Sequence, residues 1–237
     1  MPNESMWIAF GDIHEDIQHL NALPLQGAQG IIITGDLTNC GGVVKTRSIL
    51  NHIAARLFMH ADITDDDPVP QQILAQIGNM DLPEVTDFLE EMGMNMHGKV
   101  MQVSDTAVIV GLGGSNKTPF NTPSEFFEAD YEEFLNVAKS HIERLNVKHV
   151  LLVSHTPPVN TTCDAIAAGV HVGSTAVRDF IQDVQPDLCI CGHIHEAIGT
   201  DTIGRTTIIN PGSFADGGYI RVVLKEGVGF SGELCKV

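Results

Sequence analysis

Short apolar runs alternate with longer segments of helical periodicity through most of the chain, and this alternation constrains the fold more than any other feature. The apolar runs are bounded by Gly, Asp or Pro, as expected of buried strands, and they occupy residues 7–10, 31–34, 73–77, 108–111, 150–153 and 188–191. The helical segments are residues 43–58, 83–92, 124–145 and 174–184. Strands that alternate with helices predict an α/β fold.

The C-terminal part of the chain follows a different pattern. Residues 205–210, 219–225 and 227–237 predict successive short strands without helices between them. We therefore expect two mixed β-sheets that pack together and are flanked by helices, a four-layer α-β-β-α sandwich, with the C-terminal hairpins in the second sheet. Because no Pro/Gly/Ser-rich linker divides the sequence, residues 1–237 are expected to form a single domain.

Charge narrows the range of partners. The chain has 30 acidic and 13 basic residues, a net charge of −17, and no cluster of Lys or Arg. Nucleic acid and anionic membranes are therefore disfavoured as partners. The N-terminus lacks the basic region of a signal peptide, and no apolar stretch is long enough for a membrane helix. Residues 62–67 form an acidic stretch expected at the surface.

The cysteines indicate a reducing compartment. Their number is five, which is odd, and their spacing suits neither a disulfide framework nor a Cys-x-x-Cys zinc site. A cytoplasmic protein fits this pattern best. Cys189 and Cys191 lie two residues apart on an apolar run, so we expect both to pack in the core.

The most informative residues are those that come directly after the predicted strands. All are of types that bind metals, and in chain order they are Asp12, His14, Asp36, Asn79, His155, His193 and His195. Loops at the carboxyl ends of parallel strands converge on one crevice, so residues far apart in sequence can share a site. The turns of Asp12, Asp36 and His155 are each more often ordinary loops, and the loop of His193 and His195 fits a loop or a metal site equally well. The ordered set predicts a metal centre. A mixture of imidazole nitrogens with carboxylate and amide oxygens suits Mn, Fe, Zn, Co or Ni.

In this order the motifs Asp-x-His, Gly-Asp, Gly-Asn, His and Gly-His-x-His resemble those of the calcineurin-like metallophosphoesterase superfamily. The chain looks most similar to a small prokaryotic branch of that superfamily. The resemblance implies the sandwich fold and two divalent transition-metal ions, with manganese as the first choice. One ion would be held by Asp12, His14, Asp36 and His195, and the other by Asp36, Asn79, His155 and His193.

On the same resemblance Asp36 bridges the ions, and Asp36, Asn79 and His193 are the catalytic residues. The reaction implied is hydrolysis of a phosphate ester by in-line attack of a metal-activated hydroxide. The ligands include only two carboxylates against two dications, so the site keeps a charge of about +2. This charge attracts a small phosphorylated substrate, whereas the acidic surface repels longer polyanions.

One position departs from the superfamily pattern. The motif Gly-Asn-His-(Asp/Glu) is replaced by Gly-Asn-Met-Asp, with Met80 in place of the histidine that assists the leaving group. A thioether has no proton to donate, so we expect a preference for phosphodiesters with good leaving groups. Alternatively, His171 or His60 substitutes for the missing histidine. Asp81, the last residue of the motif, is expected to shape the turn or to orient the ligands.

Substrate contacts are less well defined by the sequence. Asn39, Lys117 and His171 lie on loops from which they could reach phosphate, although turn chemistry explains Asn39 and solvation explains Lys117 equally well. The Gly-x-Gly at residues 111–113 lacks the third glycine and the helix of a dinucleotide site. The other histidines are expected on the surface or on helix faces: His19, His52, His97, His141 and His149.

Other classes of function remain open at this stage. A binding or scaffolding module on the same fold is the main alternative to an enzyme, but such a module would tolerate loss of the metal ligands. Nuclease activity is disfavoured by the charge. A homodimer is compatible with the exposed sheet edges expected of such a fold.

Overall fold

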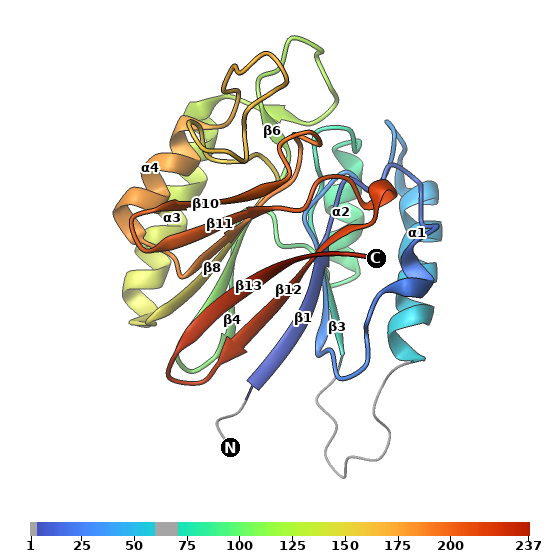
Figure 1. The fold of residues 1–237 in the computed structure, drawn as a ribbon, viewed down its shortest axis with the longest axis horizontal. Helices are drawn as coiled ribbons and strands as arrows, with labels where there is room; N and C mark the ends of the chain where they lie inside the picture. Colours follow the sequence, from blue (N-terminus) through green and yellow to red (C-terminus); the bar gives the residue numbers. More distant parts are fainter. Residues whose placement is uncertain (1–3, 60–70) are drawn as a thin grey trace.

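Two β-sheets pack face to face in the computed structural model, which describes residues 4–59 and 71–237 (Figure 1). The first sheet has the strand order β13-β12-β1-β2-β3. Its strands are β1 (Glu4–Phe10), β2 (Gly30–Ile33), β3 (Gln72–Ala75), β12 (Gly218–Lys225) and β13 (Gly229–Lys236). β1, β2 and β3 are parallel, whereas β12 and β13 are antiparallel to their neighbours.

The second sheet has the order β10-β11-β9-β8-β5-β4. Its strands are β4 (Lys99–Ser104), β5 (Ala107–Leu112), β8 (His149–Ser154), β9 (Leu188–Ile190), β10 (Gly199–Ile203) and β11 (Thr206–Asn210). The four inner strands are parallel, and the edge strands β4 and β10 pair antiparallel. A separate two-stranded ladder joins β6 (Ser115–Asn116) to β7 (Glu125–Phe126).

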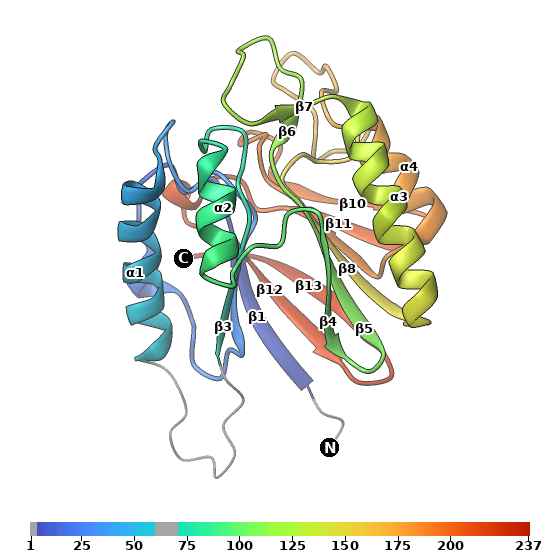
Figure 2. The ribbon, with the colours of Figure 1, turned by 180° about the vertical axis from the view of Figure 1, so that it is seen from behind.

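Helices cover the outer face of each sheet. α1 (Val43–Phe58) and α2 (Glu84–Glu91) lie on the first sheet, and α3 (Glu128–Leu145) and α4 (Thr175–Val184) lie on the second, as Figure 2 shows from behind. Short 3-10 turns are found at Leu20–Ala22 and Phe214–Asp216. α4 begins where the Ser174 hydroxyl accepts a hydrogen bond from the Val177 amide, which is a capping interaction.

Three apolar clusters hold the four layers together. Successive residues of a strand face opposite sides of its sheet, so each strand can contribute to the cluster under the helices and to the cluster between the sheets. In β2, Ile31 and Ile33 pack against α1 and α2, whereas Ile32 packs between the sheets. A third cluster lies between the second sheet and its helices and includes Cys189 and Cys191, both fully buried. The predicted sandwich of two mixed sheets with outer helices is therefore confirmed, as is the core position of the two cysteines.

The placement of the last hairpin and the start of the third helix differ from the sequence-based prediction. The last hairpin, β12–β13, joins the first sheet beside β1 rather than the second, because this places Ile220 and Val222 in the cluster between the sheets. The third helix begins at Glu128 and not at residue 124. Ser124 instead donates its hydroxyl to the Asp81 carbonyl, and β7 pairs with β6 before the helix starts.

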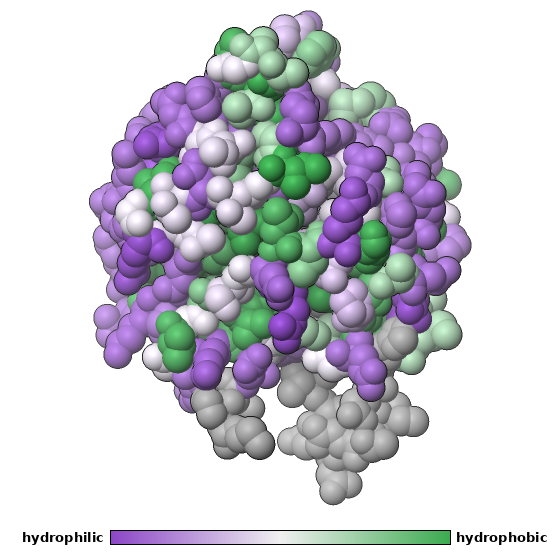
Figure 3. Space-filling model, in the orientation of Figure 1, coloured by the Kyte–Doolittle hydropathy of each residue, from purple (hydrophilic) through white to green (hydrophobic). Residues whose placement is uncertain are grey.

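The described helices include none that is long and apolar enough to cross a lipid bilayer. On the face shown in Figure 3, hydrophilic side chains predominate and hydrophobic ones are interspersed among them. The apolar runs of the sequence thus lie mainly inside, and the polar ends of the strands remain available to form a site.

Candidate metal centre

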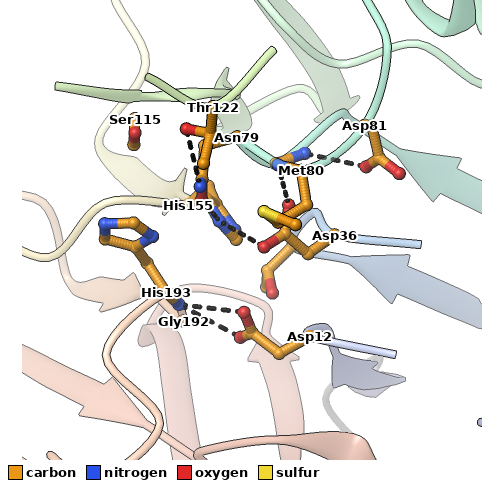
Figure 4. A network of polar contacts seen from close by, with 12 residues as sticks. Asp12, Asp36, Asn79, Met80, Asp81, Ser115, Thr122, His155, Gly192 and His193 are labelled. Atoms are coloured by element: carbon orange, nitrogen blue, oxygen red, sulfur yellow. Dashed lines mark hydrogen bonds and ion pairs between the residues drawn. The ribbon is translucent and has the colours of Figure 1, made fainter. Parts of the chain in front are cut away.

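The residues predicted as metal ligands lie at the carboxyl ends of the parallel strands. Each comes from a loop that directly follows β1, β2, β8 or β9, or closely follows β3. Figure 4 shows Asp36, Asn79 and His155 close together, with Asp12 beside the loop of Gly192 and His193. The two sheets therefore bring together residues separated by more than half of the sequence, as the convergence of strand ends predicts.

The backbone at these residues is unusual. Asp12, His14, Asp36 and His193 have positive φ angles of 49°, 47°, 52° and 67°. Residues other than glycine adopt this region rarely and at an energetic cost, and such strained positions cluster at functional sites. The fold thus imposes a strained backbone on four of the seven candidate ligands, which indicates that their side-chain directions matter.

One set of donor atoms comprises Asp12, His14 and His195. The Nε2 atoms of His14 and His195 lie 3.3 Å apart, and the His195 Nε2 lies 3.1 Å from the Asp12 Oδ1. One donor atom from each of the three residues lies within 4.8 Å of the other two. Two imidazole nitrogens and a carboxylate oxygen converging on one point form a donor set that suits a divalent transition metal.

A second set comprises Asp12, Asp36 and His155, again within 4.8 Å of one another. The Asp36 Oδ2 lies 3.5 Å from the His155 Nε2 and 3.7 Å from the His14 Nε2, so it faces both sets. The Asn79 Oδ1 lies 3.1 Å from the same His155 nitrogen. This donor set also fits a divalent cation, and the position of Asp36 suits a bridging ligand.

His193 lies beside the second set. Its ring centroid is 5.3 Å from that of His155, and its backbone N–H donates to both carboxylate oxygens of Asp12. The structure thus brings all seven predicted ligands into one region. Five of them form the two donor sets, which share Asp12, and Asn79 and His193 lie beside His155.

Buried Asp81 fixes the two turns that carry Asp36 and Asn79. Its carboxylate accepts hydrogen bonds from the backbone amides of Leu37, Thr38 and Gly78 and from the Thr38 hydroxyl. This is the turn-shaping role expected for Asp81 from the sequence. Such outer contacts orient metal ligands.

Two glycines of the motifs are required by close approach of the carboxylates. A Cβ at Gly78 would lie 2.1 Å from the Asp36 Oδ1, and a Cβ at Gly192 would lie 2.3 Å from the Asp12 Oδ2. Side chains at either position would push these carboxylates out of the site.

The carboxylates of the site create a strongly negative electrostatic field around His155. Burial alone would lower the pKa of His155, but the charges of Asp36, Asp12 and Asp81 outweigh it and raise the pKa to about 9. Burial would also raise the pKa of Asp12, but the hydrogen bond from His195 and the nearby histidines hold it at about 2. Carboxylates that draw protons onto a buried imidazole provide a field that a bound cation can satisfy.

The centre opens to solvent on one side. Asp12, Asp36 and His155 are almost fully buried, whereas the His195 side chain is 41% exposed and the His14 side chain 19% exposed.

The residues proposed to contact substrate have other partners in the structure. Asn39 donates its side-chain amide to the His14 carbonyl, so it supports the turn of a candidate ligand. The Lys117 Nζ lies 4.8 Å from the Phe127 ring centroid and 3.4 Å from the Glu125 carbonyl, within its own loop. His171 is half-exposed, and its Nδ1 lies 2.7 Å from the buried carboxylate of Asp164.

Met80 contacts the candidate metal centre through its backbone, because its N–H donates a hydrogen bond to the Asp36 Oδ1 at 2.7 Å. His60, the other candidate to replace the missing histidine, lies outside the described residues, as does the acidic stretch 62–67.

Some residues near the centre were not identified from the sequence. Thr122 accepts a hydrogen bond from the Asn79 side-chain amide, and no local sequence pattern predicts this contact. His97 was expected on the surface or on a helix face, and this is wrong. It packs against Phe126 and Phe134, and its Nδ1 accepts a hydrogen bond from the Gly113 amide.

Comparison with known proteins identifies the family of this chain. The family described as "Metallophosphoesterase, calcineurin superfamily" matches residues 67–228. An uncharacterised protein of Methanocaldococcus jannaschii, MJ1162, is 36% identical over 189 residues, which cover 78% of this chain and 77% of that protein. The chain therefore belongs to the calcineurin superfamily of metallophosphoesterases. This membership supports a metal-dependent phosphoester hydrolase.

Solved structures show the same fold at low identity. The protein TT1561 of Thermus thermophilus aligns with a TM-score of 0.66 and 16% identity, covering 98% of this chain and 99% of that one. A dimetal phosphatase from Danio rerio aligns with a TM-score of 0.58 and 13% identity, again covering 98% and 99%. These two structures therefore share the arrangement of both sheets and their outer helices with this chain.

Proposed function

We propose that this protein is a dinuclear-metal-dependent phosphohydrolase that acts on a small phosphate ester, with phosphodiesters preferred over phosphomonoesters. The observation that carries the proposal is the convergence of two donor sets that share Asp12 and are both faced by the Asp36 Oδ2. One ion would be held by Asp12, His14, Asp36 and His195, and the other by Asp36, Asn79, His155 and His193. Manganese is the metal that we propose first, with Fe, Zn, Ni or Co as alternatives.

Two bound divalent cations would polarise phosphoryl oxygens and lower the pKa of water enough for in-line attack at phosphorus. The side chains of this chain would orient that chemistry. Asp36 directs its Oδ2 toward both sets, while its Oδ1 is held by the Met80 amide. His193 lies on the strained turn after β9, with its ring centroid 5.3 Å from that of His155, and we assign it a catalytic role beside the second ion.

The charges of the site favour a small substrate. Asp12 and Asp36 offset about half of the charge of two dications, which leaves about +2 for a phosphate ester. The rest of the chain is strongly acidic, with a net charge of −17. Long polyanions such as nucleic acids would be repelled by that surface, whereas a compact ester can reach the centre.

Met80 supports the preference for esters with good leaving groups. It occupies the motif position after Asn79, where the superfamily pattern has histidine, and a thioether cannot protonate a departing alkoxide. An aryl phosphodiester needs little such help. His171, held by Asp164, is the described alternative donor.

The setting that we propose is a single cytoplasmic domain, alone or as a homodimer. All five cysteines are among the described residues and are unpaired, as expected in a reducing compartment.

The test combines metal analysis with hydrolysis of bis(p-nitrophenyl) phosphate and p-nitrophenyl phosphate, with Mn²⁺ supplied to metal-stripped protein. We expect two ions per chain and faster turnover of the diester. Asp36→Asn should lose both properties, whereas Asp105→Asn, in the exposed turn between β4 and β5, should keep them. Two bound ions with no hydrolysis of any ester would instead favour a binding or scaffolding module.

A further inference from the structure

The loop between β6 and β7 is folded around a single carboxylate. The Glu125 Oε1 accepts hydrogen bonds from the Thr118 hydroxyl at 2.5 Å, the Thr122 hydroxyl at 2.7 Å and the Thr122 amide at 2.8 Å. Partial burial acts to raise the pKa of Glu125, but these hydrogen bonds outweigh it and hold the pKa at about 2. Glu125 is therefore ionised at neutral pH and can only accept hydrogen bonds.

The Glu125 carboxylate determines the direction of the hydrogen bond between Thr122 and Asn79. A threonine hydroxyl has one proton, and at Thr122 that proton points to Glu125. Toward Asn79 the Thr122 oxygen can only accept, so it receives the Asn79 Nδ2–H at 3.0 Å. The Asn79 Oδ1 then faces the opposite way, 3.1 Å from the His155 Nε2 (Figure 4).

The orientation of this amide decides whether Asn79 can bind a cation. Its oxygen is a ligand, whereas a flipped amide would present two N–H groups to the metal and repel it. Asn79 is 5% exposed, so water has little access to stabilise the flipped form. The backbone supports the same arrangement, because the Ser124 N–H donates to the Asn79 carbonyl.

We propose that Glu125 and Thr122 are positioning residues that hold the Asn79 amide with its oxygen toward the metal centre. The β6–β7 loop thereby sets the affinity of the ion held by Asn79. This inference rests on the proposed function, since it assumes that Asn79 is a metal ligand. Residues that orient a ligand from behind typically change metal affinity by about 10–100-fold when they are removed.

The variants separate this role from general loop stability. Thr122→Val removes the hydroxyl and keeps the shape, and Glu125→Ala removes the carboxylate that orients it. Thr122→Ser and Glu125→Gln each retain the required oxygen. Thr118→Val is the matched control, because Thr118 donates to the same Glu125 oxygen, whereas the described hydrogen bonds of the Asn79 side chain are to Thr122 and His155.

The experiment is calorimetric titration of metal-stripped, full-length protein with MnCl₂, with circular dichroism to check folding. We expect the affinity of one of the two ions to fall about 10–100-fold in Thr122→Val and Glu125→Ala, with the other ion changed by less than about threefold. Thr122→Ser, Glu125→Gln and Thr118→Val should resemble the wild type.

Two results would overturn the proposal: unchanged affinity for both ions in folded Thr122→Val, or an equal loss in Thr118→Val. If Thr122→Val does not fold, the same comparison is made with Glu125→Ala, and unchanged affinity for both ions in that folded variant would overturn the proposal. Wild-type protein that binds both ions but hydrolyses no ester would contradict the proposed function, and the affinity comparison would still decide the role of the loop.

Discussion

Protonation of His97 should make the stability of this protein fall between pH 7 and pH 5. His97 packs between aromatic rings, and its Nδ1 accepts the Gly113 N–H, so the neutral imidazole is the form that fits. Burial lowers the pKa of His97 from its ordinary 6.5 to about 4. Unfolded chains bind this proton below pH 6.5, whereas the folded protein resists it down to pH 4. Stability is therefore fully present above pH 6.5 and is lost as the pH falls toward 4.

The magnitude follows from the two pKa values. A difference of about 2.5 units corresponds to about 3 kcal/mol once both transitions are complete, and about 2 kcal/mol of it is lost between pH 7 and pH 5. His97→Asn is the matched variant, because its Oδ1 can replace the Nδ1 as the acceptor and the side chain does not titrate. Its packing defect is the same at both pH values, so it cancels in the comparison.

The assay is urea unfolding of both proteins at pH 7 and pH 5 in the presence of a chelator. The candidate metal centre is the same in the two proteins, so its contribution also cancels. We expect the free-energy advantage of the wild type over His97→Asn to shrink by about 2 kcal/mol. An advantage constant to within about 0.5 kcal/mol, the precision of such extrapolations, would refute the reasoning.

Three further predictions concern the metal centre. Asp36→Asn should stay folded by circular dichroism but lose bound metal and at least about 100-fold in kcat, and near-normal values of both would contradict the bridging role. Because Met80 donates no proton, kcat on substituted phenyl phosphodiesters should fall steeply with leaving-group pKa; a flat series with chemistry rate-limiting would exclude this. Removal of the metal by a chelator should lower the Tm. The expected loss of stability is about 2.7 kcal/mol for each ion supplied at a free concentration of 100 times its Kd. An unchanged Tm would argue against tight binding.

The elements that the sequence predicts well are those with a strong local signal. α1 has the predicted bounds because its apolar residues recur on one helical face. The inner strands are found because each contains a short apolar run. β4 and β10 were missed, since both are edge strands of partly buried and exposed residues without a strong apolar run. Their pairing with β5 and β11 is what makes them strands.

The candidate ligands were recognisable for a related reason. Each of them follows a strand within a few residues, and strand direction alone places such residues at one edge of a sheet. The contacts behind them were not recognisable. Thr122 lies in a loop with no periodic pattern, and its hydrogen bond to Asn79 joins residues 43 positions apart.

The sequence by itself determined the α/β architecture, the donor types and the order in which the ligands occur, because periodicity and strand ends are local properties of the chain. Only the tertiary structure decided that the last hairpin lies beside β1, that His97 is packed among aromatic rings and that the Asn79 amide is held by Thr122. These features depend on packing between particular side chains that are distant in the chain, and the periodicity of a segment does not specify those contacts.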